Sequence, residues 1–152
     1  MPGSIAWRAS VTACEFCEIV AGRSPARIVG ETATTLSFFP LRPAAMGHTL
    51  VIPKEHIPDL WSLEAEPAGS IAEAVITMAH ALRRALEPEG LNVINSTGEA
   101  ASQSVLHLHV HLVPRWAGDH IGNIWPPSEP WSEEVKDETA DLVRSAWREG
   151  SS

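Results

Sequence analysis

Five short runs of strand-forming residues predict a β-sheet, and turn-like stretches such as 40–47 separate them. The runs lie at residues 27–31, 34–39, 48–53, 91–95 and 104–113. The last run is the most regular, because His107, His109 and His111 alternate with aliphatic residues. Since successive strand side chains leave opposite faces of a sheet, this alternation predicts three imidazoles on one face.

A second periodicity, of three to four residues, predicts the main helix at 64–86, which Pro88 and Gly90 bring to an end. Its apolar stripe comprises Ile71, Val75, Met78, Leu82 and Leu86. A short helix is predicted at 15–22 and a last one at 132–147, whose first turn is acidic and whose end is basic.

The order of these elements is a helix, three strands, a helix, two strands and a helix, with short connections between strands. That order favours an α+β fold, in which an antiparallel five-stranded sheet carries helices packed on one face. We expect a flexible N-terminal lead at 1–12 and a single domain at 13–149. A chain of 152 residues is long enough to bury a core without disulfides.

The net charge of −8 argues against a nucleic-acid polymer as a partner, because no basic stripe is visible. A small phosphorylated substrate remains compatible with an acidic chain, since a local site can still be positive. There is no apolar run near 18 residues and no signal-peptide pattern at 1–13. We therefore expect a cytoplasmic protein without a membrane partner.

Three histidines on one strand face support two kinds of chemistry. Histidines at i and i+2 can share a zinc ion with a third ligand. A neutral imidazole can instead attack phosphorus through one nitrogen while the other donates to a fixed acceptor. A partly exposed strand with incidental histidines is the third reading. His48, upstream, fits a place behind the three histidines or a plain strand edge equally well.

Cys14 and Cys17 are the only cysteines, and their spacing is that of zinc ligands. A tetrahedral site needs two further nitrogen or sulfur ligands from elsewhere in the chain. The alternative is a pair of buried thiols without a metal.

Four segments, in this order, resemble the histidine triad superfamily of nucleotide hydrolases and transferases. They are CEFCEIVAG at 14–22, GHTLVIPKEH at 47–56, SQSVL at 102–106 and VPR at 113–115, beside the histidines themselves. The resemblance covers about residues 13–126. It implies cleavage of a nucleoside phosphoramidate or a dinucleoside polyphosphate through a covalent nucleotidyl-histidine, with a purine nucleotide as the small-molecule substrate.

The resemblance also implies roles for individual residues. His109 would be the nucleophile, and His111 would bind a non-bridging phosphate oxygen. Gln103 and Ser104 would contact phosphate and help to protonate the leaving group.

Bacterial members with the cysteine pair bind zinc through two additional histidines, which here are His56 and His107. With Cys14 and Cys17 they would form a closed, structural zinc site, and no catalytic cofactor is implied. A homodimer is expected from the resemblance alone.

A base pocket is implied by apolar residues at the positions where relatives surround a purine: Phe16, Ile19, Phe38 and Leu41. Core packing is the competing interpretation of the same residues.

Three positions depart from the family pattern. Pro40 replaces a common aspartate that accepts hydrogen bonds from ribose hydroxyls. Ser96, which we assign to substrate binding, stands where many members have Asn or Gln, with Asn95 next to it. Ser102 replaces the usual glycine before Gln103.

These departures leave open a nucleotide-binding protein of the same fold with weak or no catalysis. A catalytic zinc enzyme built on the three histidines is a further alternative.

Overall fold

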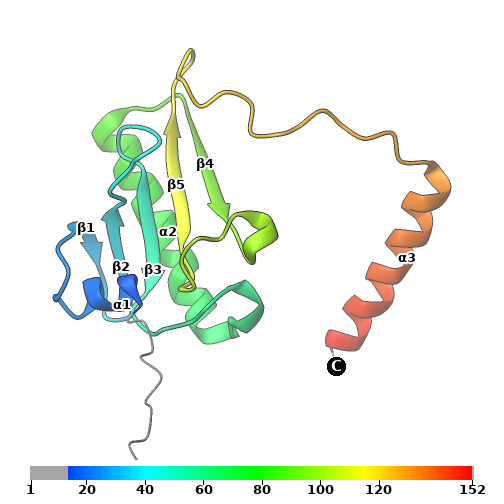
Figure 1. Cartoon of the computed structure of the whole chain (residues 1–152), viewed down its shortest axis with the longest axis horizontal. Coiled ribbons are helices and arrows are strands. Elements are labelled where there is room, and N and C mark those ends of the chain that lie inside the picture. The colour runs from blue at the N-terminus through cyan, green and yellow to red at the C-terminus, as the bar shows by residue number, and fades with distance from the viewer. Residues whose placement is uncertain (1–13, 152) are drawn as a thin grey trace, which may run out of the picture. The chain divides into compact units, whose positions relative to one another are not determined.

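A computed structural model describes residues 14–151 of the chain (Figure 1). They divide into two compact units, residues 14–121 and residues 122–151, and each is described by itself. The predicted lead at 1–12 lies outside the described residues, and the single domain at 13–149 stays a prediction. Within residues 14–151, no helix combines the length and the apolar character that crossing a membrane requires.

The first unit is built on a five-stranded sheet in which every neighbouring pair of strands is antiparallel. In spatial order its strands are β1 (Arg27–Glu31), β2 (Thr35–Phe39), β3 (Thr49–Pro53), β5 (Val110–Arg115) and β4 (Gly90–Asn95). The predicted α+β fold with a five-stranded antiparallel sheet is confirmed.

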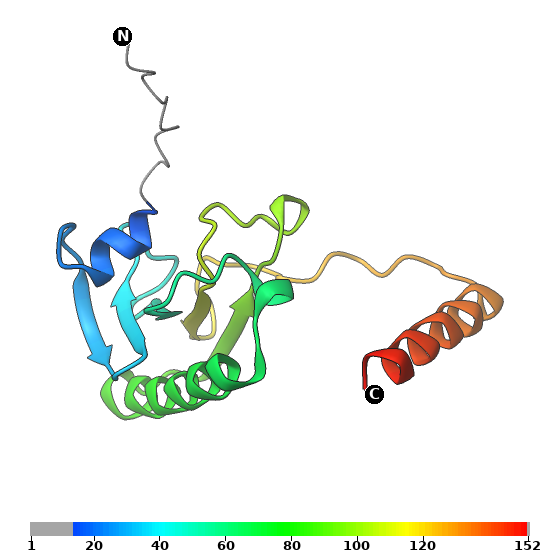
Figure 2. The same cartoon turned by 90° about the horizontal axis from the view of Figure 1, so that it is seen from below.

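Two helices of this unit lie on opposite faces of the sheet, α1 (Glu15–Val20) on one and α2 (Ala65–Leu86) on the other (Figure 2). Leu50 and Ile52 pack with α1, whereas Val51 between them packs with α2. All five residues of β3 are buried, and a strand with consecutive buried apolar residues needs cover on both faces. The expectation of helices on one face is corrected accordingly.

The predicted strand at 104–113 starts only at Val110, so His107 and His109 precede β5 and His111 alone belongs to it. The backbone N–H of Leu108 bonds to the carbonyl of Ile57, 2.6 Å away, instead of to a neighbouring strand. The predicted alternation still holds, because Leu108 is buried in a cluster with Ile57 and Ile71 of α2.

The second unit contains α3 (Glu133–Gly150), which matches the helix predicted at 132–147. Ser132 is its N-cap, and the hydroxyl of Ser132 accepts the N–H of Val135 at 3.2 Å. The acidic first turn and Arg148 in the last turn match the helix dipole.

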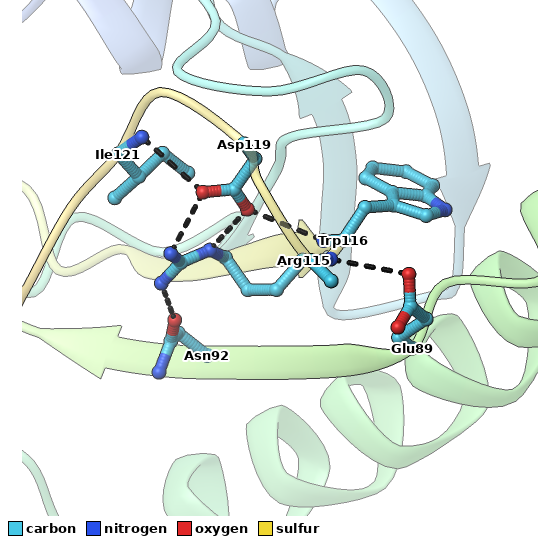
Figure 3. A network of polar contacts seen from close by, with 7 residues as sticks. Glu89, Asn92, Arg115, Trp116, Asp119 and Ile121 are labelled. Carbon is cyan, nitrogen blue, oxygen red and sulfur yellow. Dashed lines mark hydrogen bonds and ion pairs between the residues drawn. The ribbon is translucent and has the colours of Figure 1, made fainter.

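A polar network closes the turn after β5 and ties it to β4 (Figure 3). Arg115 donates from Nε and Nη2 to the two carboxylate oxygens of Asp119, at 2.6 and 2.9 Å, and from Nη1 to Asn92 at 2.7 Å. Asp119 also accepts the backbone N–H groups of Trp116 and Ile121. The bond from Arg115 is the main reason why the pKa of Asp119 lies well below its ordinary range.

We expect Asp119→Asn to lower the thermal midpoint at neutral pH, because the guanidinium loses a bidentate, charged partner. Since the folded-state pKa is depressed, the carboxylate contributes its full stability above the ordinary value of ~3.9 and loses it as the pH falls below that value. The difference in midpoint between wild type and variant should therefore shrink below about pH 4, as measured by calorimetry. Asp137→Asn, at an exposed position of α3, is the control. A difference that is equal at pH 7 and pH 3 would contradict this assignment.

Candidate functional site

A cavity of about 570 Å³ lies over the sheet face that α1 covers and brings most of the predicted site residues together. Among its lining residues are Phe16, Ile19, Phe38, Leu41, Ser104, His109 and His111. Gln103 and Ser96 are not part of its wall. Its size is in the range of small-molecule sites.

The predicted base-pocket residues are both core and cavity wall. Phe16, Ile19 and Phe38 are 5%, 7% and 2% exposed and belong to one core cluster, yet each lines the cavity. Leu41 is 83% exposed and sits at the rim. The two interpretations of these residues are therefore compatible, since one side of each buried ring packs in the core while another meets the cavity.

The hydrogen bonding of His109 determines which of its nitrogens is free. His109 Nδ1 lies 2.7 Å from the backbone carbonyl of His107, and a carbonyl can only accept, so Nδ1 carries the proton. Nε2 then keeps its lone pair. The ring is buried and held edge-on by Phe16, with 5.3 Å between ring centroids. An oriented, neutral imidazole of this kind is a nucleophile or a base.

A chain of hydrogen bonds sets the tautomer of His111 in the same way. The N–H of Ala44 donates to His48 Nδ1 at 3.0 Å, so the proton of His48 is on Nε2. His48 Nε2 lies 2.9 Å from His111 Nδ1 and donates to it, which puts the proton of neutral His111 on Nε2. Burial, then the charges of His109 and His48, lower the pKa of His111 to about 4. His111 is therefore a neutral donor at physiological pH.

His48 is thus placed behind the triad, a position that the sequence did not distinguish from a strand edge. It is 7% exposed, and burial lowers its pKa below the ordinary value. In the sequence, the feature that could have indicated this position of His48 is the Gly47-His48 pair just before β3. Gly47 has φ +79°, a conformation that glycine adopts without strain, and it directs the chain into β3.

The side chain of Gln103 is committed to the protein itself. Its Oε1 accepts the N–H of Gly98 at 2.8 Å, and its Nε2 donates to the carbonyls of Pro58 and Val105 at 2.8 and 3.0 Å. Both amide protons are used, so none remains for a phosphate oxygen. The predicted substrate contact of Gln103 stays a prediction: in this structure its side chain holds the loop that carries Ser104, and Ser104 itself lines the cavity.

Asn95, not Ser96, reaches toward the triad. The side chain of Asn95 donates from Nδ2 to the carbonyl of His109 at 3.0 Å, and its Oδ1 accepts the hydroxyl of Thr97. The predicted substrate contact of Ser96 finds no support in the geometry, because Ser96 is absent from the cavity wall. Asn95 pairs with Val110 at the point where β5 begins, so it braces the backbone of the residue that precedes the strand.

The four predicted metal ligands meet beside this cavity. The ligand atoms of Cys14, Cys17, His56 and His107 all lie within 4.8 Å of one another. Nδ1 of His107 is 3.5 Å from each cysteine sulfur, and Nδ1 of His56 is 3.3 Å from that of Cys17. Bond lengths of ~2.3 Å to sulfur and ~2.0 Å to nitrogen give sulfur–nitrogen edges of about 3.5 Å in a tetrahedral zinc site.

The protonation of this cluster also suits a metal. His107 Nε2 donates to the carbonyl of Pro53 at 2.8 Å, which leaves Nδ1 unprotonated toward the two sulfurs. Burial, followed by the hydrogen bond and charge of Cys14, raises the pKa of the Cys17 thiol. Two adjacent thiolates require a cation between them, and two sulfurs with two imidazoles match the preferences of zinc.

His107 and Phe16 connect the four predicted metal ligands with the candidate nucleophile. His107 contributes its imidazole to the cluster and its carbonyl to His109. Phe16 stands between the two cysteines in sequence, and its ring meets those of Phe38, His107 and His109 at centroid distances of 5.4, 5.9 and 5.3 Å. A change at the cluster is therefore transmitted directly to the cavity wall.

Pro40 also lines the cavity, and its side chain has no acceptor for a hydroxyl group. Glu15 contributes the only carboxylate among the lining residues of the described chain. Arg27 also lines the cavity, so its wall carries one acidic and one basic side chain beside the histidines and Ser104.

Comparison with known proteins agrees with this geometry. The family model described as HIT domain matches residues 21–118. "Protein hit" of Bacillus subtilis is 43% identical over 113 residues, 74% of this chain and 78% of that protein. The adenosine 5′-monophosphoramidase hnt1 of Schizosaccharomyces pombe is 36% identical over 81% of this chain and 90% of its own length.

Among solved structures, a Zn-bound histidine triad family protein from Mycobacterium smegmatis superposes with a TM-score of 0.69. It is 36% identical to this chain, and the match covers 88% of this chain and 97% of that one. From the family model, the relatives and the shared fold, the chain belongs to the histidine triad (HIT) family.

Proposed function

We propose that this chain is a nucleotidyl hydrolase or transferase that cleaves a nucleoside phosphoramidate or a dinucleoside polyphosphate through a covalent intermediate on His109. The observation that carries the proposal is the 2.7 Å bond from His109 Nδ1 to the carbonyl of His107, which leaves Nε2 unprotonated at a cavity of nucleotide size. The similarity to the S. pombe adenosine 5′-monophosphoramidase supports the same reaction class.

The proposed reaction has two displacements at phosphorus. His109 Nε2 attacks the α-phosphorus, and the bond from phosphorus to the leaving amine or phosphate breaks. His111, a neutral donor through Nε2, would stabilise the charge that develops on a non-bridging oxygen. The hydroxyl of Ser104, which lines the cavity, would supply a proton to the leaving group. Water then cleaves the phosphorus–nitrogen bond, and His109 returns to its neutral form.

We expect His109→Ala to reduce turnover of adenosine 5′-phosphoramidate by at least ~10³-fold, because the covalent route is lost. Release of AMP measures turnover, and acid-labile nucleotide on the intact protein reports the intermediate in the wild type. His80→Ala, at an exposed position of α2, is the matched control and should behave as wild type. Full turnover by His109→Ala would contradict the proposed mechanism.

A nucleotide-binding protein with little catalysis is the second candidate function. It is favoured by Pro40, which offers no acceptor to the substrate, and by the internal commitment of the Gln103 amide. Tight nucleotide binding by calorimetry, without any product from the wild type, would favour this second function over the first.

We further propose that Cys14, Cys17, His56 and His107 hold one structural zinc ion. Four protein ligands complete a tetrahedral shell and leave no position for a substrate or an activated water, so the ion would stabilise the fold and take no step in the reaction. A reducing compartment such as the cytoplasm, which the sequence predicts, would keep both thiols available as ligands.

We expect the purified chain to contain about one zinc ion per molecule, as structural four-ligand sites do. Zinc should be lost in His107→Ala and retained in His109→Ala, because only the first removes a ligand. Metal analysis of both variants checks this, and a chelator should lower the thermal midpoint of the wild type. Equal zinc contents in the two variants would exclude the assigned ligand set.

We also propose that the chain forms a homodimer through the β4 edge. β4 ends the sheet order, so its outer edge offers backbone N–H and C=O groups for pairing. Val93 on β4 is 52% exposed and pairs with Leu112, which packs with α2, and Ile76 of α2 is 58% exposed. Apolar side chains beside an open strand edge suit a second copy of the same chain.

We expect light scattering to give twice the mass of one chain for the wild type and the mass of one chain for Val93→Lys, because a lysine there places a charge in the interface. Ile28→Lys, at a 50% exposed position of β1, is the control and should stay dimeric. A monomeric wild type would refute the proposal.

A further inference from the structure

We propose that Cys14 and Cys17 form a reversible oxidation site, at which closure of a disulfide expels the bound metal and loosens the wall of the nucleotide cavity. The chain has no other cysteine, so an internal disulfide has only this pairing. The effect on the cavity rests on the proposed function and the loss of metal rests on the proposed zinc site, whereas the oxidation of the two cysteines rests on neither.

The backbone already holds the two cysteines at a suitable separation. Cys14 is the N-cap of α1 and Cys17 lies in its first turn, three residues later. Helical geometry places such residues ~5 Å apart at Cα, within the range of about 4.4–6.8 Å that disulfides span. Both sulfurs already share the same neighbour, Nδ1 of His107, at 3.5 Å. Rotation of the side chains is enough to bring the sulfurs together.

Small molecules can reach the cluster from one side. His56 is exposed and lines a second cavity of about 590 Å³, separate from the one that contains His109. Cys17 contacts His56 at 3.3 Å and is itself half-buried. His107, by contrast, is completely buried, so an oxidant approaches along the side of His56 and Cys17.

The chemistry balances with a low-molecular-weight disulfide as the oxidant. One cysteine thiolate attacks a sulfur of the oxidant, which forms a mixed disulfide and releases the first thiolate of the oxidant. The other cysteine thiolate then attacks the protein sulfur of that mixed disulfide, which forms the Cys14–Cys17 bond and releases the second thiolate of the oxidant. The two cysteines lose two electrons, the oxidant gains them, and the metal is left with only its two imidazole ligands.

The consequence for the cavity follows from how α1 is held. It has six residues, and Phe16 and Ile19 are its buried anchors. An isolated helix of this length is not stable in water, so α1 depends on its contacts with the rest of the protein. The metal ligands at Cys14 and Cys17 are the further attachment. Without them, Phe16 no longer has a fixed place against His109.

The test treats the zinc-loaded wild type with 4,4′-dithiodipyridine. We expect two equivalents of pyridinethione per chain, stoichiometric zinc release to a chromogenic indicator, and an intact mass lower by two hydrogen atoms than that of the reduced chain. The value of kcat/KM for adenosine 5′-phosphoramidate should fall roughly 10- to 100-fold and recover with dithiothreitol plus zinc.

Cys17→His is the matched control, because it retains a ligand for zinc but cannot form the disulfide. Its remaining Cys14 can form at most a pyridyl adduct, so it should release no more than one equivalent of pyridinethione per chain and should show no mass loss of two hydrogen atoms. Zinc that stays bound to the oxidised wild type, or pyridyl adducts that accumulate without an internal disulfide, would overturn the proposal. Zinc release and disulfide closure in a chain that shows no turnover before oxidation would support the oxidation site while the proposed function failed.

Discussion

His107 carries the interaction on which the whole site depends. Its side chain is completely buried, with Nε2 bonded to the carbonyl of Pro53 at the end of β3 and Nδ1 turned to the cysteine sulfurs. Its own carbonyl accepts a hydrogen bond from the Nδ1–H of His109. One residue therefore connects the sheet, the four candidate metal ligands and the candidate nucleophile.

The constraint behind this arrangement is the cost of burying polar rings. A buried imidazole must be neutral and its polar atoms must be satisfied, because desolvation penalises the charged form. Burial accordingly lowers the pKa values of His48, His107 and His111. Since each ring meets an acceptor or donor of fixed character, neutrality also selects one tautomer. The protein thus obtains an available nitrogen on His109 and a proton on His111 from packing and from backbone and imidazole hydrogen bonds.

The small N-terminal helix is where folding and function meet most closely. α1 covers one face of the sheet with two buried residues, Phe16 and Ile19, and with the partly buried Val20, while the long α2 covers the other face. Phe16 belongs at once to the core, to the ring contacts of His107 and His109 and to the cavity wall. In the proposed zinc site, an ion bound at the first turn of α1 would stabilise this short helix without taking part in the proposed reaction.

Hydrophobic periodicity is a local property of the chain, and it was enough to predict the strands, the long helix and the α+β class, while the resemblance of four motifs indicated the family. The sequence also indicated the cysteine pair and the triad. The placement of α1 and α2 on opposite faces and the start of β5 after His109 became visible only in the folded chain. The same is true of Gln103, which braces a loop, and of Asn95, which holds the carbonyl of His109. These features depend on hydrogen-bond partners from distant segments, such as Pro53 for His107 and Pro58 for Gln103. Whether such a partner donates or accepts then determines which atoms of the side chain remain available for chemistry.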